Sequence, residues 1–203
     1  MMKKWLLALC GVLFFAPVAF ADNWGFGVKL GAAETDAKTL NDLLSAGGGE
    51  LTEGDALFGL EVLHEWNLNS DINKLGLKIG LDIYGETEFK APWFIGKITE
   101  NVYSFPLTVY YKQDYGVQNW SWFAGVGFTF MRGEMDDGEE TYNKNIVFPH
   151  ITAGAEYRFT EVFALGIDAK YNIDAEMEKR IDGVEYKTDR SGISGAITAR
   201  FYF

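Results

Sequence analysis

The chain has 203 residues, of which 29 are acidic and 18 are basic, so its formal net charge is −11. This acidic balance argues against nucleic acid as a partner, because the phosphate backbone would repel it. Cys10 is the only cysteine, which excludes a scaffold held together by disulfide bonds.

The N-terminal segment has the features of a secretory signal peptide. Lys3 and Lys4 form a short positive region, residues 5–18 are almost uninterruptedly apolar, and Ala19-Phe20-Ala21 matches a cleavage site. We expect residues 1–21 to be removed, together with Cys10. The remaining domain, residues 22–203, would carry 16 basic residues against 29 acidic ones, a formal charge of −13.

Two other interpretations of this segment stay open. An uncleaved anchor helix would need a longer apolar run, and Pro17 lies near the end of this one. Lipidation at Cys10 would normally require a small residue before the cysteine, where this chain has Leu9. Cleavage is the favoured interpretation.

Eight segments of alternating apolar and polar residues follow in chain order. Alternation with period two is the geometry of a strand whose two faces meet different surroundings. Each segment has about the 9–11 residues that a tilted transmembrane strand requires. The segments are 24–33, 56–66, 75–85, 102–112, 120–131, 147–159, 163–172 and 191–203.

The third and the last segments show the pattern clearly. In the third, Leu77 and Ile79 share one face, and Lys78 and Asp82 share the other. The last segment ends on Phe203, with an apolar face and a polar face that carries Arg200. This is what the final strand of an outer-membrane barrel needs.

The connections between these segments alternate between long and short. The long ones are residues 34–55, 86–101, 132–146 and 173–190, and the short ones are 67–74, 113–119 and 160–162. Outer-membrane barrels have this pattern, with turns in the periplasm and loops outside, whereas a soluble sandwich has no reason to sort its loops. The sequence therefore predicts an all-β fold, an eight-stranded antiparallel up-and-down transmembrane β-barrel.

Aromatic residues cluster at the ends of the segments that adjoin the short connections. Rings favour the headgroup level of a membrane because they are apolar with a polar edge. The predicted aromatic girdle consists of Trp24, Trp66, Tyr111, Trp122, Tyr157, Phe159 and Phe163.

Several motifs resemble the opacity-type, "porin-family" small outer-membrane β-barrel proteins. They are Ser104-Phe105-Pro106-Leu107-Thr108, Trp122-Phe123-Ala124-Gly125-Val126-Gly127, Ala153-Gly154-Ala155-Glu156-Tyr157-Arg158-Phe159 and the terminal Phe201-Tyr202-Phe203. The resemblance covers residues 22–203 and is specific for architecture, not for activity. It implies that Phe201, Tyr202 and Phe203 form the signal that the barrel-insertion machinery reads.

The polar faces of the strands predict a charged barrel lumen. At eight strands the interior is only wide enough for side chains, and buried charges persist only when they are paired. We therefore expect a polar plug, with a narrow path for ions or small solutes as the alternative. The predicted lumen network is Glu61, Glu65, Lys78, Asp82, Tyr110, Lys112, Glu156, Arg158, Asp168, Lys170 and Arg200, with Lys29 and Tyr84 facing the same way.

Catalysis is the weaker interpretation. The chain has two histidines, His64 on the predicted lipid face and His150 on the inner face. Barrel hydrolases and acyl transferases need a histidine next to a serine and an orienting group, and no serine stands two residues after His150. We predict no enzyme, no catalytic residues, no cofactor and no metal.

The long connections are candidates for recognition. The third and fourth are acidic and could attract divalent cations or a basic partner, but Asp137-Gly138-Glu139 lacks the spacing of a calcium loop, so solvated loops are favoured. Residues 39–46 suit a short amphipathic helix.

The sequence thus predicts a monomeric outer-membrane protein with a structural or surface-interaction role. Its expected partners are outer-membrane lipid and lipopolysaccharide, the barrel-insertion machinery, and an extracellular ligand at the loops. A pore, a lipid-modifying enzyme and a soluble lipocalin-like binder with an apolar cavity are the alternatives.

Overall fold

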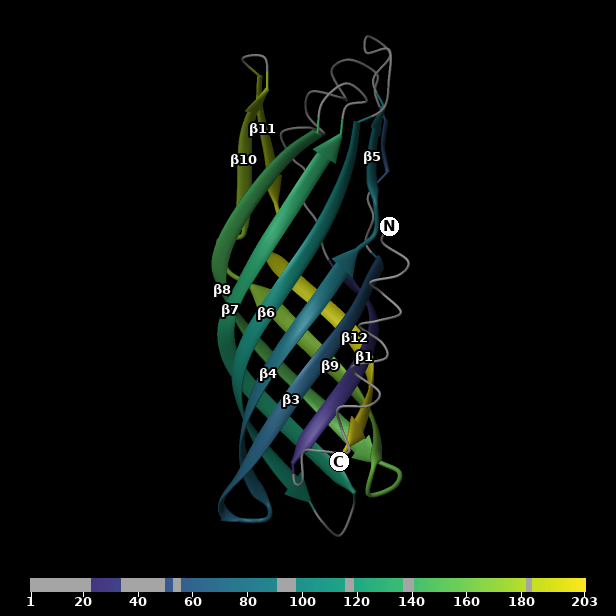
Figure 1. Ribbon diagram of the computed structural model, residues 1–203, viewed down its shortest axis with the longest axis vertical. Coiled ribbons are helices and arrows are strands. Elements are labelled where there is room, and N and C mark those ends of the chain that lie inside the picture. The colour runs from purple at the N-terminus through teal and green to yellow at the C-terminus, as the bar shows by residue number, and fades with distance from the viewer. Residues whose placement is uncertain are drawn as a thin grey trace.

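The computed structural model describes residues 23–33, 50–52, 56–90, 98–115, 119–136, 141–181 and 184–203. The regular structure in these ranges is β-strand (Figure 1). None of the described residues forms a helix long and apolar enough to cross a membrane. The strands are β1 (Trp24–Ala33), β2 (Glu50–Thr52), β3 (Ala56–Ser70), β4 (Asn73–Tyr84), β5 (Thr87–Lys90), β6 (Ile98–Tyr115), β7 (Trp120–Asp136), β8 (Thr141–Arg158), β9 (Phe163–Asn172), β10 (Glu176–Ile181), β11 (Val184–Asp189) and β12 (Gly192–Tyr202).

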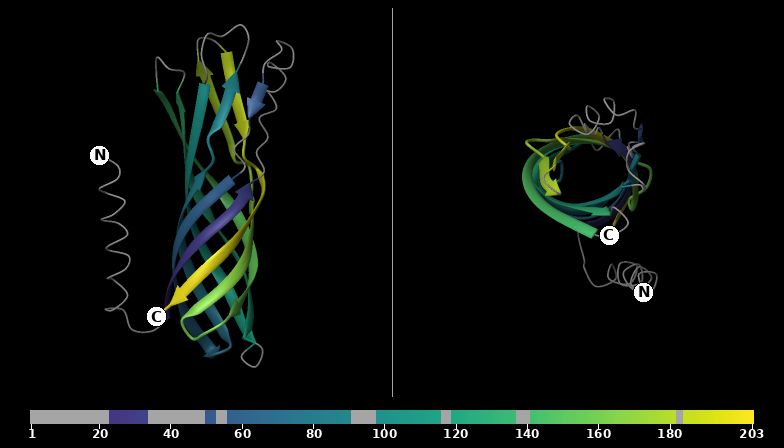
Figure 2. Two further views of the ribbon diagram at one scale, coloured as in Figure 1. Left: turned by 90° about the vertical axis from the view of Figure 1, so that its right-hand side faces the viewer. Right: turned by 90° about the horizontal axis from the view of Figure 1, so that it is seen from above.

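Eight of these strands close into a barrel. β1, β3, β4, β6, β7, β8, β9 and β12 each pair antiparallel with the next, and β12 pairs back to β1 with Arg200 opposite Gly27. Seen from above, the strands form a ring (Figure 2). Closure lets the strands of the ring pair on both sides, which the hydrocarbon interior of a membrane demands. The predicted eight-stranded antiparallel barrel is confirmed.

Several strands are longer than their alternation predicts. β1 and β9 have the predicted limits, but β7 and β8 stay paired as far as Asp136 opposite Thr141. Most of the predicted third long loop is therefore a hairpin. The alternation stops there because the outer face turns polar, with Arg132 and Asn143 exposed, while the backbone pairing continues.

Other predicted connections also contain strands. β2 pairs with β5, and β10 pairs with β11 as a hairpin that stands at the same end of the barrel (Figure 1). The short connection predicted at 67–74 is largely hairpin too, because β3 and β4 remain paired up to Ser70 and Asn73. The predicted helix at 39–46 and the signal peptide lie outside the described residues.

The two faces of the barrel wall differ in the way that a lipid environment requires. On the outside, Val126, Ile167 and Ile197 are 62%, 64% and 64% exposed. On the inside, Lys112 and Glu156 are each 1% exposed. An apolar exterior with charges inside is the reverse of a soluble ligand-binding barrel and excludes the lipocalin-like alternative.

Aromatic rings contact one another around the short-turn end. Trp120, Tyr157, Phe159, Phe163 and Phe201 form a continuous series with centroid distances of 5.1, 4.8, 6.0 and 5.2 Å. The other residues predicted for the girdle also contact rings there. Trp24 and Trp66 contact the His64 ring at 4.7 and 4.4 Å, and Tyr111 contacts Trp122 at 5.6 Å.

Candidate functional site: the barrel lumen

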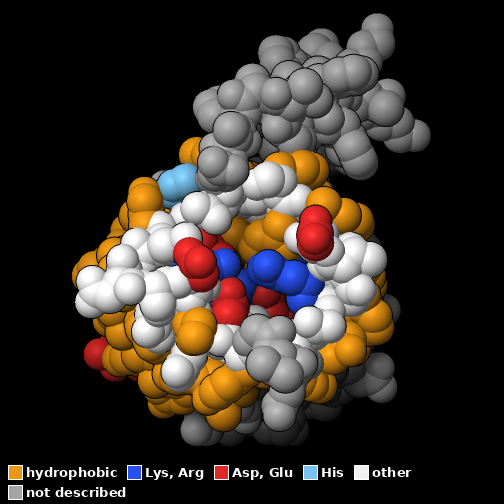
Figure 3. All heavy atoms as spheres, turned by 90° about the horizontal axis from the view of Figure 1, so that it is seen from below, with side chains coloured by type: hydrophobic (Ala, Val, Ile, Leu, Met, Phe, Trp, Pro, Cys, Tyr) orange, Lys and Arg blue, Asp and Glu red, His pale blue; other side chains and the backbone are white. Residues whose placement is uncertain are grey.

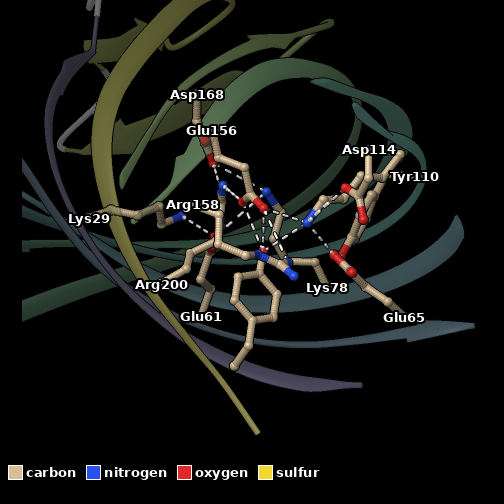
Figure 4. Close-up of polar contacts among 12 residues, drawn as sticks. Lys29, Glu61, Glu65, Lys78, Tyr110, Asp114, Glu156, Arg158, Asp168 and Arg200 are labelled. Carbon is tan, nitrogen blue, oxygen red and sulfur yellow. Dashed lines mark hydrogen bonds and ion pairs between the residues drawn. The ribbon is translucent and has the colours of Figure 1, made fainter. Parts of the chain in front are cut away.

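Arg200 lies at the centre of the charged lumen. It projects inward from β12 and is 2% exposed. Its Nε donates to Glu61 Oε1 at 2.7 Å, its Nη1 to Glu156 Oε2 at 3.1 Å and its Nη2 to Asp168 Oδ2 at 2.5 Å (Figure 4). These carboxylates come from β3, β8 and β9. One guanidinium therefore joins β12 to three other strands, across the seam where the barrel closes.

Lys112, on β6, forms a second junction nearer the short-turn end. Its ammonium donates to Glu65 Oε1 at 3.0 Å, to Glu156 Oε1 at 2.5 Å and to the Tyr202 hydroxyl at 3.0 Å. The Tyr110 hydroxyl also donates to Glu65, at 3.0 Å. The Tyr110 ring lies where a side chain at Gly76 would be, because a Cβ there would come within 2.1 Å of the ring.

Three lysines complete the network on the side of the loops. Lys29 and Lys170 lie 2.5 and 3.0 Å from the two carboxylate oxygens of Asp82. Lys78 lies 3.3 Å from Asp168. These ion pairs connect β1, β4 and β9. Since β4 and β9 lie on opposite sides of the ring, the pairs between them cross the lumen.

The eleven residues predicted for the lumen all face inward and meet in this network. Lys74 and Asp114 also join it, 2.9 Å apart. Neither was predicted for the lumen because both fall in predicted turns, although Asp114 continues the inward phase of Lys112, two residues earlier. The described network has seven cations (Lys29, Lys74, Lys78, Lys112, Arg158, Lys170 and Arg200) and six carboxylates (Glu61, Glu65, Asp82, Asp114, Glu156 and Asp168), an excess of one positive charge.

His150 belongs to a neutral polar layer next to the charges. Its Nε2 lies 2.9 Å from the Thr108 hydroxyl, and its Nδ1 lies 2.9 Å from the Thr129 hydroxyl. Both ring nitrogens are therefore occupied by threonines, and neither contacts a serine or a carboxylate. This is the arrangement of a structural histidine rather than of a general base.

Replacing His150 by alanine should lower the free energy of unfolding by about 1–3 kcal/mol, because two buried hydroxyls lose their partner. Urea unfolding of the barrel in lipid vesicles measures this cost. His64→Ala is the matched control, since His64 lies on the outer face and its removal leaves no buried lumen group unpaired. Equal stability of His150→Ala and the wild type would contradict the role of this layer.

An apolar layer lies above the polar ones, toward the loop end. Leu57, Val102, Met131 and Phe148 point inward and are at most 5% exposed, and Met177 from β10 packs onto them. This layer was not predicted, although its strand residues continue the inward phase; Phe148, for example, precedes His150 by two positions. The layer places apolar side chains in the lumen above the charged network.

A buried ion pair separate from the charged network lies at the loop end of the barrel, beside the apolar layer. Arg190 donates to Glu100 Oε2 at 2.9 Å, and both side chains are at most 5% exposed. The Arg190 guanidinium also lies 5.6 Å from the centre of the Tyr84 ring. It connects the segment after β11 to β6, which holds the base of the β10–β11 hairpin over the lumen.

The cavities inside the network are small. One of about 10 Å³ borders Lys112 and Arg200, and one of about 30 Å³ borders Lys78 and His150. Such volumes hold about one or two water molecules each. In the described part of the chain, no three His, Cys, Asp or Glu side chains are placed to hold a metal ion.

Comparison with known proteins identifies the family. The family model of the outer membrane protein beta-barrel domain matches residues 6–201. The fold resembles Neisserial surface protein A, with a TM-score of 0.57 and 14% identity over 90% of this chain and 98% of that one. It also resembles Ail of Yersinia pestis, with a TM-score of 0.52 and 10% identity over 89% and 98% of the two chains. No curated protein matches the sequence.

Proposed function

This chain belongs to the outer membrane protein beta-barrel family, and we propose that it is a non-conducting barrel that anchors surface loops in the bacterial outer membrane. The observation that carries this proposal is the filled lumen. Ion pairs centred on Arg200 and Lys112 cross it, and an apolar layer that includes Phe148 lies above them. A hydrated path would have to break both layers.

The surface role rests on the loop end of the barrel. β2, β5 and the β10–β11 hairpin all lie there, beyond the apolar belt (Figure 1). They add paired backbone outside the membrane, which gives the loops a fixed base from which to meet an extracellular ligand. The short-turn end would face the periplasm.

The ends of the chain fit the same proposal. Phe201 and Phe203 are exposed on the outer face, while Tyr202 points inward and donates to Glu156. Phe201 and Phe203 thus lie where the insertion machinery, and afterwards lipid, can contact them. Tyr202 holds the last strand in place through its hydrogen bond on the lumen side. Export would use residues 1–21 as a cleaved signal.

A narrow conduit is the second candidate, because cavities of about 10 and 30 Å³ do lie on the lumen axis. Conductance of the purified protein in a planar bilayer separates the two. We expect no stepwise ion current from a barrel whose folded state is verified by a difference in gel mobility before and after boiling. Discrete current steps would contradict the non-conducting proposal.

A further inference from the structure

The opening at the short-turn end has a hollow with charged side chains at its floor. Viewed from below, Lys, Arg, Asp and Glu side chains gather at the centre of the barrel, and hydrophobic side chains lie around its outside (Figure 3). A cavity of about 190 Å³ lies at this end, larger than the two within the network. It is lined by Asp114, Tyr115, Asn119, Trp120, Ser121 and Arg158.

Arg158 has the weakest ion pair of the seven network cations. Each of the other six has a carboxylate oxygen within 3.3 Å. The closest carboxylate oxygen to Arg158 belongs to Glu156 and lies 3.8 Å from Nη2, beyond hydrogen-bonding distance. Glu156 already accepts from Lys112, Arg200 and Tyr202. Arg158 is therefore the network cation whose charge is least neutralised by a close carboxylate.

The position of Arg158 is fixed, although its guanidinium donates no hydrogen bond within the described part of the chain. Its guanidinium lies 4.5 Å from the centre of the Tyr202 ring, which holds the planar group by a cation–π contact. The side chain is 31% exposed and lines the hollow. Asp114, the carboxylate that also lines it, is neutralised by Lys74 at 2.9 Å and lies 4.0 Å from Lys112.

We propose that this hollow binds a small oxyanion, a phosphate or a carboxylate, through Arg158. A guanidinium presents a fork of N–H donors that matches two oxygens of such an anion. Ser121 and Asn119 can supply further hydrogen bonds from the wall of the hollow. The anion is either a free solute on this side of the membrane or the headgroup phosphate of a lipid beside Trp120, which is 50% exposed at the rim.

The test is a titration followed by nuclear magnetic resonance. Isotope-labelled barrel in a maltoside detergent, which carries no phosphate, is titrated with inorganic phosphate or acetate at constant ionic strength. We expect saturable shifts of the Ser121 amide and the Trp120 indole, with at least tenfold weaker binding in Arg158→Gln. Arg158→Lys keeps the positive charge but loses the paired N–H donors of the guanidinium, so it should weaken binding severalfold. This variant also tests the proposal if Arg158→Gln does not fold.

Arg132→Gln is the matched control, because Arg132 is an exposed arginine at the opposite end, paired with Glu134 at 2.8 Å. It should bind as the wild type does. Shifts that do not saturate, or that persist in Arg158→Gln, would overturn the proposal. Repetition in phospholipid nanodiscs separates the two sources: loss of the phosphate response there identifies a lipid headgroup in the hollow, and an unchanged response identifies a free oxyanion.

Discussion

Replacing Arg200 by methionine should lower the free energy of unfolding by about 3–5 kcal/mol, because it leaves buried carboxylates without their common partner. Glu61 and Glu156 are each 1% exposed. Glu61 would keep only the longer contacts to Lys29 and Lys78, at 3.9 and 3.6 Å, and Glu156 would lose one of its charged donors. Methionine roughly preserves the volume, so the effect reports the charge and not a cavity. Urea unfolding in lipid vesicles, followed by tryptophan fluorescence, measures it.

The matched control is Arg132→Met. Arg132 also pairs with a carboxylate, Glu134 at 2.8 Å, but the two side chains are 46% and 34% exposed. Water screens that pair, so its loss should cost no more than about 1 kcal/mol. Similar costs for the two variants would show that the buried network does not support the barrel.

An arginine at Val126 should have the second large effect, about 2–4 kcal/mol of destabilisation. Val126 is 62% exposed on the outer face of β7, midway between Trp122 and Phe130 in the apolar part of the strand, where its side chain would meet hydrocarbon. A charge at that depth has no water and no counter-ion. The same unfolding assay measures the cost.

Asn101→Arg serves as the control for this variant. Asn101 lies on the same outer face of the neighbouring strand, but nearer the loop end and opposite Glu134. There an arginine meets water and a carboxylate, so the expected change is within about 1 kcal/mol. A harmless arginine at Val126 would mean that lipid does not contact this face.

Sequence alone predicts which way each residue faces but not its depth in the barrel. Period-two alternation assigns Glu61 and Arg200 to the inner face, yet they lie 139 residues apart and meet at 2.7 Å. Their meeting depends on register, which the closure of β1 onto β12 and β3 determines. Alternation within single strands contains no information on that pairing.

The parts that sequence reasoning missed have a common physical cause. Lys74 and Asp114 lie where the hydrophobic signal fades toward the turns, and Met131 and Phe148 lie where the outer face turns polar toward the loops. In both regions the contrast between the faces weakens while the strands continue. Extending each strand's inward phase by two residues beyond the apolar belt would have found Asp114.

The filled lumen also explains how a barrel with so many buried charges can be stable. Taking an isolated charge from water costs several kcal/mol, and the cost is offset only when each charge finds close partners. Arg200 and Lys112 each meet several acceptors from different strands. Such pairing favours one register over others, since a slip of one residue would turn these groups toward lipid.

The central claim is that lipid contacts the apolar outside of the barrel and that the charges fill its axis. Replacing Cys10, the only cysteine, by serine removes the competing thiol, so single cysteines placed one at a time from Trp122 to Phe130 can carry a spin label. Accessibility to oxygen, which concentrates in lipid, should be high at residues 122, 124, 126, 128 and 130 and low at the residues between them. Uniform accessibility along the strand, or an alternation of the opposite phase, would contradict the account.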